Sequence, residues 1–296
     1  MKHMLILLIK NIYVRLVKPK FVRNCNFISR AQMMKFMMKG GSIVRFGDGE
    51  FSIMAGISSP EFQKNSDTLR VCLDQVFDFW DDSFLICIPM SIANPNSYKK
   101  LTPRAAFFWL RFMNRNYKWL VARISTERCY GDAQFSRPYM DTLNYNYCEK
   151  YFKEIKLMFA QKEITVIEGS KTRFGVGNDL LEYARSVKRI VGPSVDAFNA
   201  LDDLEHVAKK LPKSTLIILA LGPASKPLAL RLFRLGYQVW DLGHLDVEYE
   251  WFRKRVSKKE LIPGKYVNEN PLRLAQELPE KFLEKYNKEI IYRTPV

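Results

Sequence analysis

The sequence predicts an α/β fold, a mostly parallel β-sheet flanked by helices, from three observations. Short apolar runs closed by Gly, Pro or Asp recur along the chain, helical patterns separate several of them, and hydrophobic residues make up 47% of the 296 positions. Strands that alternate with helices are typical of a parallel sheet covered on both faces. A chain of this length builds one large domain or two small ones around a substantial core.

Six apolar runs are the predicted strands, at residues 42–46, 84–88, 164–168, 189–191, 216–221 and 238–242. Helical patterns lie at residues 179–186 and, between the last two strands, at residues 227–235. Residues 103–159 differ, because aromatic residues and Arg dominate there and strand signals are few. We expect this region to form a mostly helical, aromatic-rich insertion on the sheet, with irregular loops.

The composition favours an anionic partner and a reducing compartment. Lys and Arg total 47 against 31 Asp and Glu, a formal net charge of +16, which suits nucleic acid, nucleotides or an acidic membrane surface. Five cysteines without a CxxC pair indicate reduced thiols in a cytosol and exclude a zinc finger. With three histidines in the chain, a bound metal would rely on oxygen ligands, which favour Mg²⁺ or Mn²⁺.

The N-terminal segment mixes apolar and basic residues. Its apolar run, residues 4–9, is too short to span a bilayer, and no small-residue cleavage site follows it. Basic residues interleaved with Ile and Val predict either an interfacial helix on an anionic membrane or a terminal helix docked on its own domain.

The hexapeptide RFGDGE, residues 45–50, places two glycines around two acids. A surface turn accounts for it, because Gly tolerates positive φ and Asp bonds its own backbone, and the hexapeptide taken alone favours that turn. Alternatively, the preceding apolar run is a buried strand, and the glycines let a bulky ligand approach Asp48 and Glu50 at its end. A divalent cation between these acids and a diphosphate would offset the charge of a leaving group.

Two further segments follow predicted strands. In IEGSKTRFGVGNDLL, residues 167–181, a strand leads through a loop with Lys171, Arg173 and two glycines into a predicted helix, a combination that makes an anion site for a diphosphate. It lacks the GK[ST] of a Walker A loop and the third glycine of a dinucleotide fingerprint. In residues 216–243, a clearer βαβ unit places Ser225, Lys226 and Asp241 where an open α/β sheet holds a nucleotide. Without a ligand, either segment is an ordinary packing unit.

The next stretch, HLDVEYEW, spaces titratable residues at every second position: His244, Asp246, Glu248 and Glu250. In an extended chain they share one face, which suggests metal ligation or a carboxylate with a raised pKa suited to general base catalysis. In a helix, Asp246 and Glu250 pair at i, i+4, and the pattern then favours metal ligation or general base catalysis less strongly. A solvated acidic strand is the remaining alternative.

The loop at residues 125–139 carries charged and aromatic residues that are hard to bury together: Arg128, Tyr130, Asp132, Arg137 and Tyr139. Such residues commonly line sugar sites. The basic run at residues 253–259 is by default a solvated helical face, and alternatively a contact for phosphates or lipid head groups.

Five segments in order, SIVRFGDGE, GSKTRFGVGNDLL, LALGPASKPLA, LGYQVWDLGHLDVEYEWF and GKYVNE, resemble the bacterial glycosyltransferases of the GT-D fold, formerly a domain of unknown function numbered 1792. The resemblance implies one Rossmann-like domain, residues 26–296, after a basic amphipathic segment, residues 1–25. It also implies a cytoplasmic enzyme that moves a hexose from UDP-glucose or a related UDP-sugar onto a glycan of a bacterial surface glycoprotein or polysaccharide. Contact with the inner face of the cell membrane, a lipid-linked acceptor and a homo-oligomer are compatible with it, and no nucleic acid partner is expected.

The resemblance also implies roles for particular residues. Asp48 and Glu50 match a DxE motif that holds Mn²⁺ or Mg²⁺, and His244, Asp246 and Glu248 would lie near the reacting sugar. Independently of the resemblance, the loop at residues 125–139 leads us to expect that Arg128, Tyr130 and Arg137 bind the acceptor. Asp246 or Glu248 would deprotonate the acceptor hydroxyl if the reaction inverts the anomeric centre. The family's loop more often has an acid where Ser170 stands here. The residues expected to bind the nucleotide sugar are Arg45, Gly47, Lys171, Thr172, Arg173, Gly175, Gly177, Asn178, Gly222, Ser225, Lys226 and Asp241.

Two other classes of protein fit part of the sequence. A basic nucleic-acid-binding module fits the net charge, although the acids of RFGDGE and HLDVEYE would repel phosphates without a metal. A methyltransferase or dehydrogenase fits the same sheet and would bind S-adenosylmethionine or NAD with no response to Mn²⁺.

Overall fold

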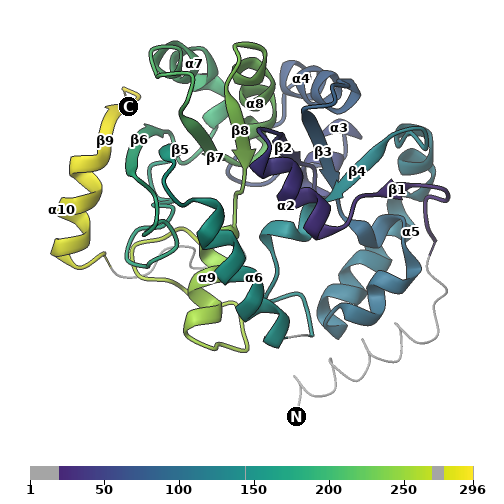
Figure 1. The fold of residues 1–296 in the computed structure, drawn as a ribbon. Coiled ribbons are helices and arrows are strands. Elements are labelled where there is room, and N and C mark those ends of the chain that lie inside the picture. The colour runs from purple at the N-terminus through teal and green to yellow at the C-terminus, as the bar shows by residue number, and fades with distance from the viewer. Residues whose placement is uncertain (1–19, 144, 269–276, 296) are drawn as a thin grey trace.

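The computed structural model describes residues 20–143, 145–268 and 277–295. In this part of the chain nine strands form one parallel sheet, in the order β1-β4-β3-β2-β8-β7-β5-β6-β9, with β1 and β9 at opposite edges (Figure 1). The predicted α/β class with a parallel sheet is therefore confirmed. The strands are β1 (Asn26–Phe27), β2 (Ser42–Arg45), β3 (Phe84–Ile88), β4 (Cys129–Asp132), β5 (Glu163–Gly169), β6 (Ser186–Gly192), β7 (Leu216–Ala220), β8 (Gln238–Asp241) and β9 (Ile290–Arg293).

Helices cover both faces of the sheet, because the central strands are apolar on both sides. In β7 every residue is buried, and Ile217 and Leu219 pack into one hydrophobic core while Leu216 and Ile218 pack into the other. The first core is completed by α3 (Asp48–Met54), α4 (Asp67–Asp78), α5 (Pro103–Arg123), α7 (Leu201–Ala208) and α8 (Ser225–Arg234). The second core is completed by α2 (Arg30–Met38), α6 (Tyr145–Met158) and α9 (Leu245–Arg253), and α10 (Glu280–Glu289) packs near β9.

The region at residues 103–159 is helical as expected, but it is not an insertion on the sheet. Between α5 and α6 the chain forms β4, which pairs with β3 and β1 inside the sheet. The strand sequence CYGD has no apolar run, so that its pattern gave no strand signal. Gly131 is required by close packing, since a Cβ at this position would lie 2.5 Å from the Cys87 Sγ.

Two predicted elements have another conformation. Residues 179–186 form turns and the start of β6, and no helix follows the glycine-rich loop. Residues 245–253 form helix α9 and not an extended strand, so that Asp246, Glu248 and Glu250 do not share one face of a strand. The apolar residues Leu245, Tyr249 and Phe252, spaced at i, i+4 and i+7, pack into the second core and explain the helix.

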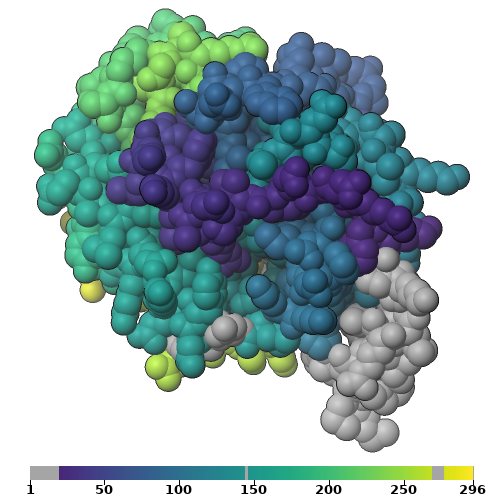
Figure 2. Space-filling model, turned by 45° about the vertical axis from the view of Figure 1, so that its right-hand side comes forward, coloured from purple at the N-terminus to yellow at the C-terminus, as the bar shows by residue number. Residues whose placement is uncertain are grey.

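The first described residues lie along the surface of the domain, as the purple band in Figure 2 shows. Val22 is buried, with 2% of its surface exposed, and its N–H donates to the carbonyl of Ile92 at 3.0 Å. The rest of the basic N-terminal segment, for which both membrane contact and docking on the domain were expected alternatives, lies outside the described residues. Among the helices of the described chain, none combines the length and the apolar character that crossing a bilayer requires.

Candidate active site

A cavity of about 570 Å³ opens at the carboxyl ends of the central strands. Its walls are formed by the residues that end or follow β2, β7 and β8 in the middle, β3 and β4 on one side, and β5 and β6 on the other. An open α/β sheet binds its ligands at this edge, and β2 and β8 are neighbours here although they are far apart in the sequence. The cavity is therefore the candidate active site.

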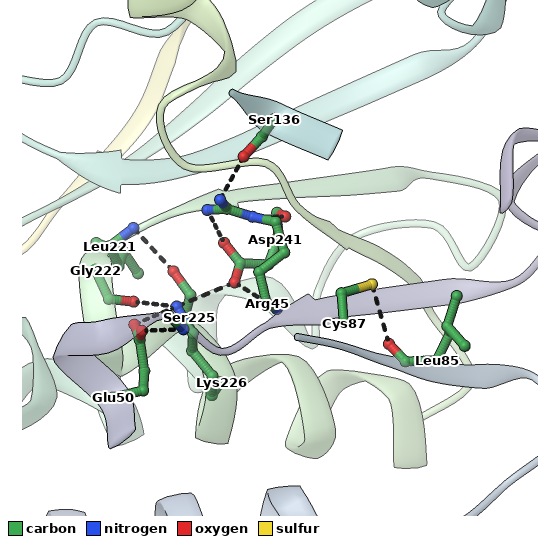
Figure 3. A network of polar contacts seen from close by, with 11 residues as sticks. Arg45, Glu50, Leu85, Cys87, Ser136, Leu221, Gly222, Ser225, Lys226 and Asp241 are labelled. Carbon is green, nitrogen blue, oxygen red and sulfur yellow. Dashed lines mark hydrogen bonds and ion pairs between the residues drawn. The ribbon is translucent and has the colours of Figure 1, made fainter. Parts of the chain in front are cut away.

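Asp241, at the end of β8, lies at the centre of a buried polar network (Figure 3). The backbone N–H of Arg45 donates to its Oδ2 at 3.1 Å, and the Arg45 guanidinium donates to its Oδ1 at 3.2 Å and to its carbonyl at 2.8 Å. A further guanidinium N–H of Arg45 donates to the Ser136 Oγ. Burial alone would raise the pKa of the Asp241 carboxyl, but the charges of Lys226 and Arg45 hold that pKa below its ordinary value.

Lys226 connects this network to the RFGDGE segment. Its ammonium lies 3.1 Å from the Asp241 Oδ2 and 2.7 Å from the Glu50 Oε1 (Figure 3). The other Glu50 oxygen accepts the backbone N–H of Gly47 at 2.8 Å, which caps the first turn of α3. The result is a row of alternating charges, from Glu50 through Lys226 and Asp241 to Arg45.

Gly243 is required by this network, because its φ is +45° and a Cβ would lie 2.0 Å from the Arg45 Nη2. A side chain here would both strain the backbone and displace the guanidinium from Asp241. The glycines of RFGDGE are not used in this way. Gly47 has a φ of −115°, and the hexapeptide is neither the surface turn nor a loop but the end of β2 and the start of α3.

The carboxylates of Asp48 and Glu50 both line the cavity, and they fit a divalent cation in one form. Among the described residues, no three His, Cys, Asp or Glu side chains converge as a metal cluster. Mg²⁺-type sites commonly use one or two carboxylates and take their remaining ligands from substrate phosphates and water. Asp48 and Glu50 therefore suit a cation that a diphosphate helps to hold. Glu50 already contacts Lys226, so that such a cation competes with the Lys226 ammonium for this carboxylate.

The glycine-rich loop after β5 contributes less than the sequence predicts. Gly169 and Thr172 line the cavity, but Lys171 is exposed outside it and Arg173 donates to the carbonyl of Gly264 at 2.9 Å. Gly175 and Gly177 shape turns with φ of +73° and +79°, and Asn178 binds α9. The expected anion site at this loop lacks both its helix and its two cations.

The α9 acids lie behind the cavity wall, and only His244 of the three expected catalytic residues lines it. The Asp246 carboxylate is 2% exposed and accepts the Lys265 ammonium at 2.5 Å and the Asn178 amide at 2.7 Å. The same amide binds Glu250 at 2.7 Å, so that Asp246 and Glu250 form the i, i+4 pair considered for a helix. This cluster links α9 to the loops that carry Asn178 and Lys265, and neither of the two carboxylates lines the cavity.

Glu248 is fully buried and holds the chain between β4 and α6. Its Oε2 accepts the backbone N–H groups of Tyr139 and Met140, each at 2.9 Å, while its Oε1 has no hydrogen-bond partner in the described structure. Burial and the nearby charge of Asp141 raise the pKa of the Glu248 carboxyl to about 7, against the opposing effects of Arg137 and the two N–H groups. The neighbours of Tyr139 and Met140, Arg137 and Asp141, line the cavity.

Of the expected acceptor residues, only Arg137 lines the cavity. Tyr130 is fully buried in the first core, and Arg128 donates to the carbonyls of Phe77 and Phe79 at 2.9 and 3.0 Å. Both residues therefore anchor the start of β4 in the fold, and we remove them from the acceptor site. Ser225 is also buried and accepts the N–H of Leu221 at 3.0 Å, which shapes the turn before α8.

The sequence patterns missed part of the cavity wall. Among the missed residues are Arg104, Phe108 and Trp109 from α5, Asp141 and Lys259 from loops, and Tyr266 and Asn268 near the end of the domain. Lys259, from the basic run at residues 253–259, pairs with Asp141 at 3.3 Å. These residues do not follow the predicted strands, and the resemblance in GKYVNE was the one signal that included Tyr266 and Asn268.

Comparison with known proteins gives a consistent family. A family model described as "Glycosyltransferase GT-D fold" matches residues 43–270. The "Glycosyltransferase GlyD" of Streptococcus pneumoniae serotype 4 is 32% identical over 252 residues, which is 85% of this chain and 30% of that protein. The "Probable glycosyl transferase Gly" of Streptococcus gordonii is 32% identical over 250 residues, 84% of this chain and 36% of that protein. The chain thus spans about a third of the length of these curated relatives.

Solved structures agree with the sequence relatives. One, described as "The highly conserved domain of unknown function 1792 has a distinct glycosyltransferase fold", has a TM-score of 0.81 at 31% identity and covers 95% of this chain and 97% of that chain. Another, "A New Glycosyltransferase (DUF1792) from Streptococcus sanguinis", has a TM-score of 0.83 at 28% identity and covers 92% of this chain and 100% of that chain.

Proposed function

The chain belongs to the GT-D fold family of glycosyltransferases, and from this premise we propose that it moves a hexose from a UDP-sugar onto a glycan acceptor with the help of a divalent cation. The observation that carries this proposal is the junction of β2 and β8, where exposed Asp48 and buried Glu50 lie beside the cations Arg45 and Lys226. A site with both carboxylates and cations can hold a metal and a diphosphate together.

The diphosphate of the donor binds at the start of α8 and not at the glycine-rich loop after β5. Gly222 and Pro223 line the cavity just before this ten-residue helix, and its N-terminus favours negative charge. Lys226, in the first turn of the same helix, and Arg45 add positive side chains. Thr172 and Ser194, which line the cavity beyond β5 and β6, contact the nucleoside part of the donor.

Asp48 and Glu50 hold the divalent cation, which when bound offsets the negative charge that develops on the departing nucleoside diphosphate. Arg45 remains fixed on Asp241 and orients the phosphates from the side of β8. Two cavity-lining groups outside the charged row, Asp141 and His244, are the candidates to accept the proton of the acceptor hydroxyl if the reaction inverts the anomeric centre. These two replace Asp246 and Glu248 in that role.

The acceptor binds on the α5 side of the cavity. The Phe108 and Trp109 rings offer apolar faces for a sugar, and Arg104 and Arg137 offer charged donors for its hydroxyl, carboxylate or phosphate groups. We assign the acceptor to a glycan on a bacterial surface glycoprotein or polysaccharide, on the basis of the family resemblance.

The exposed face of α5 extends this basic wall away from the cavity. The 21-residue helix has no acidic residue, and its exposed positions are Arg104, Phe108, Arg111, Arg115, Lys118, Val121 and Ala122. The first five lie at helical spacing, and four of these five are basic. Basic residues that surround an exposed aromatic ring suit the head-group region of an anionic membrane. We therefore propose peripheral contact with an anionic membrane through α5.

The test is hydrolysis of a panel of nucleotide sugars by the purified protein, with Mn²⁺, with Mg²⁺ and with EDTA. We expect release of UDP from one UDP-hexose that depends on the cation and is lost in Asp48→Asn. Binding of S-adenosylmethionine, NAD or an oligonucleotide without any donor hydrolysis would contradict the proposal and favour one of the other classes.

A further inference from the structure

We propose that Lys226 couples the binding of the divalent cation to the binding of the nucleoside diphosphate, because its ammonium remains paired with the Glu50 carboxylate until a diphosphate offers it another acceptor. This inference rests on the proposed function, and it concerns a residue that lies between the two ligand positions. Lys226 is here a positioning residue that controls which ligand can bind first.

The Lys226 ammonium is almost fully buried and its hydrogen-bonding capacity is used. The side chain is 4% exposed, and its nitrogen lies 2.7 Å from the Glu50 Oε1, 3.1 Å from the Asp241 Oδ2 and 3.2 Å from the carbonyl of Gly222 (Figure 3). An ammonium has three N–H donors, and these three acceptors account for all of them. A phosphate can therefore bind Lys226 only if one of these contacts is released.

A divalent cation that arrives without a nucleotide meets an occupied ligand. One Glu50 oxygen contacts the Lys226 ammonium, and the other accepts the N–H of Gly47 at 2.8 Å. A cation bound to the same carboxylate would lie close to the Lys226 charge, and two positive charges at that separation in a buried site repel each other strongly. The cation alone must displace Lys226 from Glu50 and therefore binds weakly.

A diphosphate changes this balance because it gives Lys226 a new acceptor. The flexible lysine stem allows the ammonium to leave Glu50 while it keeps its contact with Asp241, whose second partner, Arg45, stays in place. Glu50 is then available to the cation. Because such coupling is reciprocal at equilibrium, the nucleotide raises the affinity for the cation by the same factor as the cation raises the affinity for the nucleotide.

Calorimetric titration of Mn²⁺ into the full chain, with and without saturating UDP, measures the coupling. In wild-type protein we expect UDP to raise the Mn²⁺ affinity at least tenfold. In Lys226→Met we expect Mn²⁺ alone to bind at least fivefold more tightly than in wild type, and UDP to raise that affinity by a factor at least fivefold smaller than in wild type, because only the direct contact of the diphosphate with the cation remains.

Lys156→Met is the matched control. The Lys156 ammonium also bridges two carboxylates, Asp179 and Glu182 at 2.5 Å each, but it does not line the cavity. We expect wild-type coupling in this variant, so that loss of coupling in Lys226→Met cannot be attributed to the removal of a bridging lysine in general.

A second variant keeps the inference testable if Lys226→Met fails to fold. In Glu50→Gln a neutral amide replaces the carboxylate that holds Lys226, so that the ammonium is released more easily. We expect this variant to bind UDP in EDTA at least threefold more tightly than wild type, although it loses affinity for Mn²⁺.

The outcomes separate this inference from the proposed function. Equal Mn²⁺ affinity with and without UDP in a wild-type protein that binds UDP, undiminished coupling in Lys226→Met, or unchanged UDP affinity of Glu50→Gln in EDTA would each overturn the role of Lys226 and leave the function standing. A wild-type protein that fails to bind UDP both in the presence and in the absence of the cation would overturn both.

Discussion

Replacing Glu248 by Gln should change how the stability of the domain depends on pH. The Glu248 carboxyl is fully buried with its pKa raised from 4.5 to about 7. In the unfolded chain the group ionises above pH 4.5, whereas in the folded domain it keeps its proton until about pH 7. The folded state therefore binds more protons in this window, and the contribution of Glu248 to stability falls as the pH rises through it.

The magnitude follows from the two pKa values. Between pH 5 and pH 8 the unfavourable contribution of Glu248 grows by roughly 2 to 3 kcal/mol, on the basis of 1.36 kcal/mol per pKa unit. Gln cannot ionise, so that the free energy of unfolding of Glu248→Gln relative to wild type should rise by that amount between the two pH values. Any fixed cost of the buried amide is the same at both pH values and cancels.

The assay is urea unfolding of wild type and Glu248→Gln at pH 5 and pH 8, followed by circular dichroism. Glu284→Gln, on the exposed side of α10, is the control and should differ equally from wild type at both pH values. A difference between wild type and Glu248→Gln that stays constant within about 0.5 kcal/mol would refute the buried, protonated Glu248 inferred here.

Three further predictions follow from the site and its surroundings. Gly243→Ala should lose about 2 kcal/mol or more of stability and weaken UDP binding, because its Cβ meets the Arg45 guanidinium. The control Gly236→Ala, with a φ of +85° and no atom within 4 Å of the added Cβ, should cost about 1 kcal/mol of stability and leave UDP binding unchanged. Equal effects of the two variants in urea unfolding and in UDP calorimetry would contradict this prediction. Asp246→Asn should lower the melting temperature, because buried Lys265 loses its nearest charge. Donor hydrolysis and transfer should stay within about threefold of wild type, whereas loss of a general base would cost about a hundredfold. A hundredfold fall in kcat would therefore restore Asp246 to catalysis. The triple variant Arg111→Glu/Arg115→Glu/Lys118→Glu should reduce sedimentation with phosphatidylglycerol vesicles at least tenfold, while donor hydrolysis is unchanged. The control variant Lys35→Glu/Lys39→Glu/Lys210→Glu should sediment with the vesicles as wild type does. Wild-type vesicle binding by the first variant, or preference of the protein for an acidic polypeptide over the vesicles, would overturn the membrane contact of α5.

The central sheet was predictable because its strands are apolar on both faces. The strands β2, β3, β5, β6, β7 and β8 each overlap a predicted strand, and β3 has the predicted bounds. The strand β4 was not predictable in this way, since its sequence contains Gly131 and Asp132, and its place depends on packing against Cys87. The stretch HLDVEYEWF, residues 244–252, carries both a period-two pattern of acids and an i, i+4, i+7 pattern of apolar residues, and burial of the apolar residues favours the helix.

The residues at the centre of the cavity were predictable from the position of strand ends in a parallel sheet, whereas the other residues of its wall were not. Arg45, Asp48, Lys226 and Asp241 all end or follow predicted strands, and the carboxyl ends of parallel strands meet at one edge. The direct contact of Lys226 with Glu50 was not foreseen, because it joins helices far apart in the sequence. Arg104 and Lys259 reach the cavity from a helix and a loop whose position depends on tertiary packing alone.

The most direct test of the account is a crystal structure of the protein with Mn²⁺ and UDP, with the metal located by its anomalous scattering. We expect one strong manganese peak within about 2.5 Å of a carboxylate oxygen of Asp48 and of Glu50, with the diphosphate of UDP completing the site at the start of α8. A metal bound elsewhere in the cavity, or UDP bound with its diphosphate away from Arg45 and Lys226, would contradict it.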